Sequence, residues 1–174
     1  MNLLSDRRIP LLLVLLLFLV PLNMYVIGEW IGTGVQWALF RYQDTVYGTS
    51  LITLMRDYEF IAYGVLTGKT AISILLWIGG AVLLIIAFIA LAALIAEKTD
   101  EKMHIPGLLV IASGILFLAS CMVQYGPFLS GPAGFTVPIG IPLVWAVGWL
   151  IFIKDTPGQH EDKGGEEADR PFDE

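Results

Sequence analysis

The sequence predicts an all-α membrane protein with four transmembrane helices. Of its 174 residues 56% are hydrophobic and only 15% are charged, whereas soluble domains carry about a quarter charged residues. A soluble fold of this size lacks the interior volume to hide so much apolar surface. The 51 residues between Lys102 and Lys154 contain no Asp, Glu, Lys or Arg. Both features indicate that hydrocarbon surrounds much of the chain.

Four apolar stretches approach the length of about 20 residues that crosses about 30 Å of hydrocarbon. The expected spans are residues 9–27, 71–96, 105–123 and 139–153. The second is the longest, and the fourth is short, with Pro142 near its start. The first resembles the front of a secretory signal peptide, but no small-x-small cleavage site follows Pro21, so we expect a retained membrane anchor.

The distribution of Lys and Arg predicts that both termini are cytoplasmic. With the N-terminus inside, the outer loops hold only Arg41, Arg56 and Lys69. An even number of spans also places the two termini on one side. The basic residues then on the cytoplasmic side are Arg7, Arg8, Lys98, Lys102, Lys154, Lys163 and Arg170.

The outer loop, residues 28–70, is rich in aromatic residues. From Ser50 to Tyr63 apolar residues recur at helical spacing, which predicts an amphipathic helix on the bilayer surface or capping the bundle. A strand over Thr45–Leu54 is the competing prediction, because Thr and Tyr favour strands. The connection 125–142 is rich in Gly and Pro and is expected to pack against the bundle or to dip into it.

Residues 155–174 carry the whole of the chain's net charge of −6 and are predicted to be a disordered acidic cytoplasmic tail. The chain has no basic stripe that would displace counterions from phosphates, so nucleic acid is not an expected partner.

No catalytic, cofactor or metal site is predicted. The interiors of the expected spans hold no ionisable side chain, and His104, His160 and the single Cys121 form no cluster with ligand spacing. We therefore expect a protein that is not an enzyme.

Two sets of residues remain as candidates for contacts. Small residues repeat every seven positions on the third span, which favours close packing within the bundle, with self-association as the alternative. The helix-packing candidates are Gly107, Gly114, Cys121, Ser113, Ser120, Gly79 and Gly80. The outer-loop interaction candidates are Trp30, Trp37, Arg56, Asp57 and Glu59. Membrane anchoring is the alternative for the tryptophans, and solvated or mutual pairing is the alternative for the charged residues.

The order of parts resembles the claudin-like group of tetraspan membrane proteins. Trp30 and the stretch Gly34-Val35-Gln36-Trp37 are similar to the tryptophan and Gly-Leu-Trp signature of that family's first outer loop. The resemblance covers the topology and few residues, and it carries no functional residue to this chain. The family's paired loop cysteines are absent here, which argues against its outer β-sheet.

These observations predict a small multi-pass protein of the cell membrane that acts as a structural or accessory subunit. Its expected partners are the lipid bilayer and other membrane proteins or further copies of itself. One alternative is an oligomeric channel or transporter unit lined by Gly and Ser faces. Another is a membrane enzyme with an outer-surface site at Arg56, Asp57 and Glu59.

Overall fold

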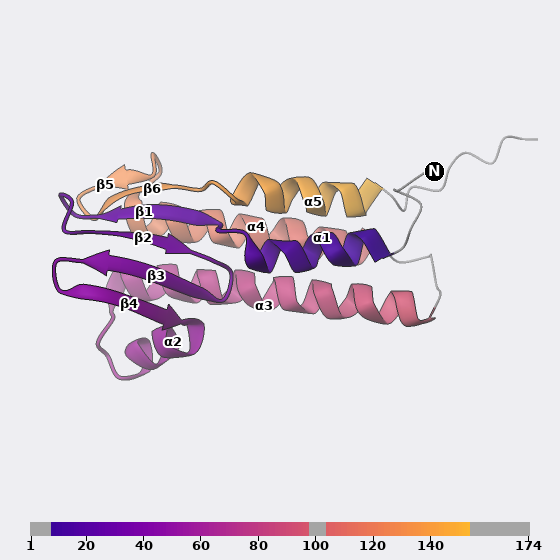
Figure 1. Cartoon of the computed structure of the whole chain (residues 1–174), viewed down its shortest axis with the longest axis horizontal. Coiled ribbons are helices and arrows are strands. Elements are labelled where there is room, and N and C mark those ends of the chain that lie inside the picture. The colour runs from indigo at the N-terminus through magenta and orange to yellow at the C-terminus, as the bar shows by residue number, and fades with distance from the viewer. Residues whose placement is uncertain (1–7, 98–103, 154–174) are drawn as a thin grey trace, which may run out of the picture.

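The computed structural model describes residues 8–97 and 104–153, which form five helices and a six-stranded sheet. The helices are α1 (Arg8–Leu19), α2 (Leu54–Ala62), α3 (Gly68–Glu97), α4 (His104–Tyr125) and α5 (Ile141–Ile153). The strands are β1 (Asn23–Ile27), β2 (Gly32–Gln36), β3 (Phe40–Thr45), β4 (Gly48–Thr53), β5 (Ser130–Gly131) and β6 (Gly134–Val137). Figure 1 shows the sheet beside one end of α3 and α4, and α1 and α5 beside their other end.

The predicted all-α fold with four transmembrane helices is wrong. Within the described residues, two helices are long and apolar enough to cross a membrane, namely α3 and α4, and they are consistent with membrane association. Helices α1 and α5 have 12 and 13 residues, or about 18 to 20 Å at 1.5 Å per residue, which is short of about 30 Å of hydrocarbon. The segments expected to lie outside the membrane form mainly an antiparallel sheet.

The prediction of a first span over residues 9–27 is wrong for its second half, which is not helical. Helix α1 ends at Leu19 because Pro21 has no N–H to continue the helix and also restricts Val20. The following apolar residues form β1, which has a partner strand on each side. A short apolar run cannot distinguish a helix from a strand, and here the strands that pair with it decide.

The sheet is antiparallel throughout, in the order β4-β3-β2-β1-β6-β5. Its last two strands come from the connection 125–142, which therefore extends the sheet begun by residues 23–53. The sheet forms without any loop cysteine, so the expectation against an outer β-sheet is wrong. Backbone pairing of β1 with β2 and with β6 joins residues 23–53 to residues 134–137.

The amphipathic helix expected over residues 50–63 is shorter than predicted. It begins at Leu54, where the Thr53 side chain caps it by accepting a hydrogen bond from the N–H of Arg56. The residues before it form β4 (Gly48–Thr53), which lies within the strand of the competing prediction, Thr45–Leu54. Helix α2 contacts both β4 and α3.

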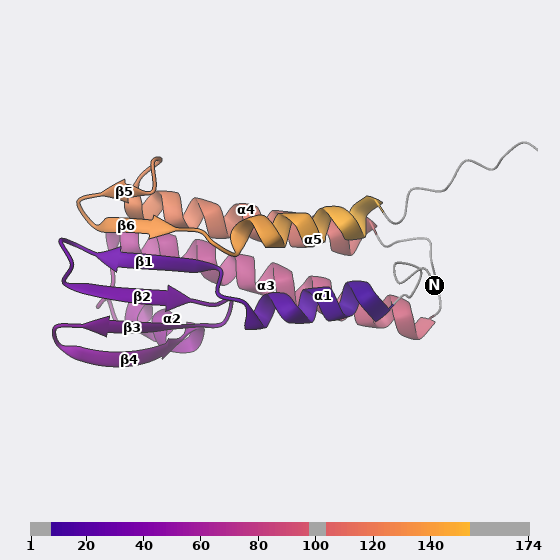
Figure 2. The ribbon, with the colours of Figure 1, turned by 45° about the horizontal axis from the view of Figure 1, so that its top comes forward.

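The hydrophobic core lies between the helices. Buried residues of α3 recur at three- and four-residue spacing and form one face; they are Ile74, Trp77, Ala81, Leu84, Ala87 and Leu91. Helix α4 packs between α3 and α5, and α1 contacts both α3 and α5 (Figure 2).

The first residue of α1 and the last residue of α5 lie at the end of the molecule opposite the sheet, as the indigo and yellow ends of the ribbon in Figure 1 show. Arg8 is the one basic residue on the predicted cytoplasmic side that the structure describes. The others counted there (Arg7, Lys98, Lys102, Lys154, Lys163 and Arg170), and the predicted disordered tail 155–174, lie outside the described residues.

Candidate functional site

The sheet face toward α3 and α4 is polar, and its main feature is a buried ion pair. Arg41 of β3 donates to a carboxylate oxygen of Asp57 on α2, with an N–O distance of 2.6 Å. Asp57 is only 2% exposed. Burying a carboxylate requires such a partner, so this pair ties α2 to the sheet.

Tyr25 lies beside this pair, in the centre of the same face. Its ring covers Gly34 on the neighbouring strand, where any Cβ would collide with the ring. Its hydroxyl donates to Oε1 of Gln43, at 3.4 Å. Glycine at position 34 is therefore what allows an aromatic ring to lie flat on the sheet.

Polar contacts extend from this centre to the helices. The Thr136 hydroxyl donates to Asn23 across β6 and β1, and both residues are buried. Ser73 of α3 and Ser120 of α4 bond to each other's backbone carbonyls, at 3.0 and 2.7 Å. Together these contacts satisfy polar groups that the sheet and helix ends would otherwise bury unpaired.

A small cavity of about 60 Å³ lies within this polar region, between the sheet and the outer ends of α3 and α4. Nε of Arg41 and Oε1 of Gln124 have no hydrogen-bond partner among the described residues, and both residues line the cavity. One is a donor and the other an acceptor. The space suits a water molecule, whereas it is too small for an organic substrate.

The ion pair sets the ionisation behaviour of the cluster. Burial raises the pKa of the Asp57 carboxyl, and the charge and hydrogen bond of Arg41 offset part of that rise. Burial also raises the pKa of the Tyr25 phenol, which therefore remains neutral at physiological pH. In this cluster burial therefore disfavours the charged form of Asp57, Arg41 favours it, and the phenol is neutral.

The opposite face of the sheet is apolar and open. One row of cross-strand neighbours runs through β6, β1, β2, β3 and β4; it consists of Val137, Met24, Val35, Tyr42 and Leu51, and we call it the apolar row. Leu51 is 64% exposed, and the large side chains beside it on β3, β1 and β6 are also exposed. A groove of about 420 Å³ lies over this face, between Trp30 and Ile139.

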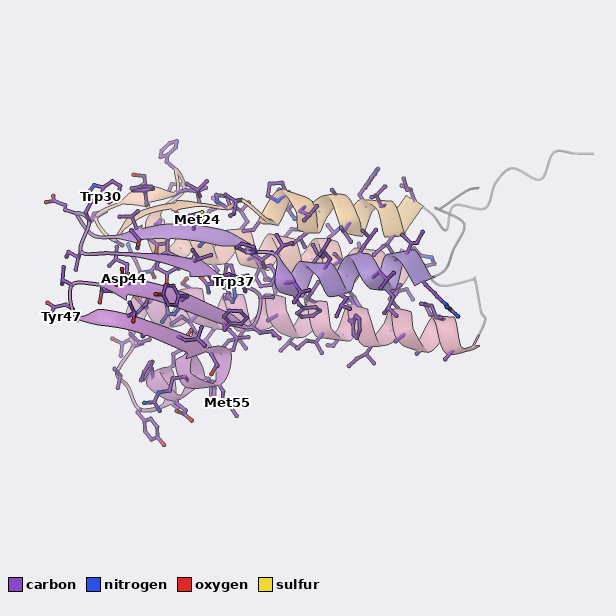
Figure 3. All side chains as sticks on the ribbon, viewed as in Figure 1. Met24, Trp30, Trp37, Asp44, Tyr47 and Met55 are labelled. Carbon is purple, nitrogen blue, oxygen red and sulfur yellow. The ribbon has the colours of Figure 1, made fainter. Side chains whose placement is uncertain are left out.

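Large side chains are exposed on three turns next to the sheet. Tyr47, on the turn between β3 and β4, is 93% exposed, and Phe128, after α4, is 92% exposed. Trp30, between β1 and β2, is 72% exposed and has a φ of 65°. Figure 3 places Trp30 and Tyr47 at the end of the molecule farthest from α1 and α5. We call Trp30 and Tyr47 the aromatic tip.

The conformation of Trp30 is costly. A bulky residue in the left-handed region is an outlier, and such strain costs about 1 to 3 kcal/mol. The ring contacts Phe135 edge to face, with ring centroids 5.9 Å apart, and stays largely in contact with solvent. The turn therefore holds an aromatic ring outward at the expense of local stability.

The predicted outer-loop residues separate into different environments. Trp37 is half-buried: its indole N–H donates to the Leu19 carbonyl at the end of α1, and its ring stacks on Phe40 with ring centroids 4.8 Å apart. Figure 3 places it where the sheet meets the helices. Its own carbonyl accepts a bond from Trp77, which is buried. Trp37 is thus a joint between α1, the sheet and α3.

Arg56, Asp57 and Glu59 do not converge on one site. Arg56 and Glu59 form an exposed ion pair at 3.1 Å, and Arg56 also lies over the Phe60 ring. Asp57 points to the buried side of α2, whereas the sequence placed it on the solvated face. The face predicted to be apolar carries Met55, which is 70% exposed and points away from the sheet in Figure 3.

The helix-packing candidates contact other helices of the same chain. A Cβ at Gly107 or Gly114 would meet Phe152 or Trp145 of α5, and one at Gly79 or Gly80 would meet Leu116 or Phe117 of α4. Ser120 bonds to α3, Ser113 bonds within α4, and Cys121 is buried beside the polar cavity. These small residues therefore bring α3, α4 and α5 close together.

The described residues contain no group of three or more His, Cys, Asp or Glu side chains that would hold a metal ion. No protein-family model matches the chain, and a search of curated proteins gives no similar sequence. The two open surfaces, the aromatic tip and the apolar row, are the features from which a function can be argued.

Proposed function

We propose that this protein is a non-catalytic accessory subunit of the cell membrane that docks the outer part of another membrane protein through its aromatic tip. The chain crosses the membrane more than once, through α3 and α4. The observation that carries the docking proposal is Trp30, a large aromatic side chain held in solvent by a strained turn. Strain of this kind persists at functional sites, and exposed Trp and Tyr are typical anchors of protein interfaces.

Membrane residence is supported by the surface of α3. Only 28% of its most apolar 18-residue window is buried inside the protein, whereas a core helix of a soluble protein is mostly buried. Exposed large apolar residues along it include Ile72, Val82, Ile86 and Ile89. Hydrocarbon is the solvent that such a surface requires.

The outward direction of the sheet is supported by the positive-inside rule. Arg8 begins α1 at the end opposite the sheet, next to Arg7 in the sequence. We assign this end to the cytoplasm and the sheet to the outer side. No described feature favours the oligomeric pore, because the Gly and Ser faces that would line it contact one another within the chain.

Site-specific photo-crosslinking in native membranes tests the proposal. A photoreactive phenylalanine analogue at Tyr47 should give one defined protein adduct, and Trp30→Ala should reduce its yield several-fold. Trp149→Ala is the matched control, because Trp149 is also an exposed tryptophan but lies on α5, and it should leave the yield unchanged. A second variant carries the photoreactive analogue at Phe128 instead. Absence of any protein adduct from both the Tyr47 and the Phe128 variant would refute the docking proposal.

A further inference from the structure

The two faces of the sheet have the reverse of the polarity usual in soluble proteins. An antiparallel sheet in a water-soluble fold packs its apolar face on the core and turns its polar face to solvent. Here Arg41, Gln43 and Asn23 face the helices, while the apolar row faces outward. Apolar-out and polar-in is the pattern of strands that lie in lipid.

The short helices imply where hydrocarbon ends. Helix α1 covers about 18 Å, and the five residues that follow, up to Met24, add at most about 16 Å, the length that they would have if fully extended. A hydrocarbon layer of about 30 Å that starts at Arg8 therefore reaches Met24. The same reasoning applied from Ile153 back along α5 reaches Val137. Met24 and Val137 are direct cross-strand partners, so two separate segments give the same depth.

The chemistry of the sheet changes at that depth. The apolar row contains no charged side chain. The next outward-facing row toward the tip keeps apolar residues on β6 and β1 (Phe135 and Val26), but on β2, β3 and β4 it consists of Thr33, Asp44 and Thr49. The two rows are two residues apart on each strand, or about 7 Å. In Figure 3, Met24 lies between Trp37 and the tip.

Hydrocarbon demands that backbone groups be bonded within the protein; this holds for the groups described at the β6 end of the apolar row, whereas β4 at the other end is an edge strand. On the β6 side, the N–H of Thr136 donates to the Leu129 carbonyl, and the N–H of Ile139 donates to the Val137 carbonyl. On the other side, β4 continues directly into α2, which packs beside it.

From these observations we infer that the bilayer covers the base of the sheet, so that acyl chains of the leaflet on the sheet side contact the apolar row. The lipid–water boundary lies between that row and the row of Thr33, Asp44 and Thr49. This inference rests on the membrane residence in the proposed function, and it does not depend on a partner at the aromatic tip.

Spin labels on single cysteines provide the test. In a Cys121→Ala background, labels are placed at Leu51 and Thr49 of β4, at Tyr42 and Asp44 of β3, and at Ile89 of α3. The protein is purified and reconstituted alone in phosphatidylcholine vesicles. Electron paramagnetic resonance then measures the accessibility of each label to oxygen, which concentrates in hydrocarbon, and to a water-soluble nickel complex.

The expected ratio of oxygen to nickel accessibility is several-fold higher at Leu51 and Tyr42 than at Thr49 and Asp44, and is high at Ile89. If Ile89 is in lipid but Leu51 is as accessible to nickel as Thr49, the inference about the sheet is overturned while membrane residence stands. If Ile89 is also in water, both are overturned. If Leu51 is shielded from both reagents and the shielding is relieved by diluting the protein in lipid, a second copy covers the row and the inference is overturned.

Discussion

The two faces of the outer sheet differ in chemistry and in how firmly they are held. The inner face buries an ion pair, a tyrosine over a glycine, and hydrogen bonds to α3 and α4. The opposite face exposes an apolar row that no other part of residues 8–97 and 104–153 covers. A sheet in water would reverse this arrangement. The difference teaches that polar contacts attach the sheet to the helices, while its apolar side is available to lipid and to other proteins.

Breaking the buried ion pair should have the largest effect. Asp57→Ala leaves Arg41 buried without a counter-charge, and we expect a loss of about 3 to 5 kcal/mol in the free energy of unfolding. Unfolding of the purified protein by denaturing detergent, followed by tryptophan fluorescence, measures it. Glu59→Ala removes only the exposed pair with Arg56 and should change stability by about 0.5 kcal/mol or less. Equal losses of stability from Asp57→Ala and Glu59→Ala would contradict the buried ion pair between Asp57 and Arg41.

A methyl group on the inner face should be the next most harmful change. Gly34→Ala places a Cβ against the ring of Tyr25, and such overpacking costs about 1 to 3 kcal/mol. Thr33→Ala, the neighbouring residue on the open face, should cost about 0.5 kcal/mol or less. The same unfolding measurement compares them. A gain in stability from Gly34→Ala, as strand propensity alone would give, would contradict the packing of Tyr25.

The pH dependence of stability should carry the signature of Asp57. Burial raises the pKa of this carboxyl in the folded state above its ordinary value of 3.8, so the folded protein binds more protons than the unfolded chain between the two values. Stability from this group is therefore greatest below pH 3.8 and is lost as the pH rises through the folded pKa. Asp57→Asn should remove this component when unfolding is followed across that pH range. An unchanged pH profile in the variant would assign the dependence to other groups.

The smallest expected effect concerns the open face. Leu51→Lys places a charge near the proposed lipid boundary, where the cost is about 0 to 1 kcal/mol. Thr49→Lys, on the water side of that boundary, should have no measurable cost. The difference should be seen in vesicles and not in a mild detergent that adapts to the protein surface. A larger loss of stability from Thr49→Lys than from Leu51→Lys would show that the proposed boundary is in the wrong place.

Particular residues show how far the sequence predicted the site. Trp30 was identified from its position in the outer loop, and the structure exposes it. Trp37 looked equivalent in the sequence, but its indole caps α1. Asp57 was placed on the polar face of α2 with Arg56 and Glu59, because helical periodicity separates apolar from charged residues without showing which face is covered. The site residue that the sequence did not reveal is Arg41. It is a charged residue of β3 whose side chain faces inward and pairs with Asp57.

The sequence by itself determined the apolar character of the chain and the two long helices, because uncharged runs of more than 20 residues have few alternatives. Only the tertiary structure decided that residues 23–27 and 134–137 are strands, since short apolar runs suit either element and the pairing of β1 with β6 joins segments 113 residues apart, as Asn23 and Thr136 show. It also decided which side of the sheet and of α2 is covered. That choice depends on which surface finds a partner, and a periodic pattern does not contain this information.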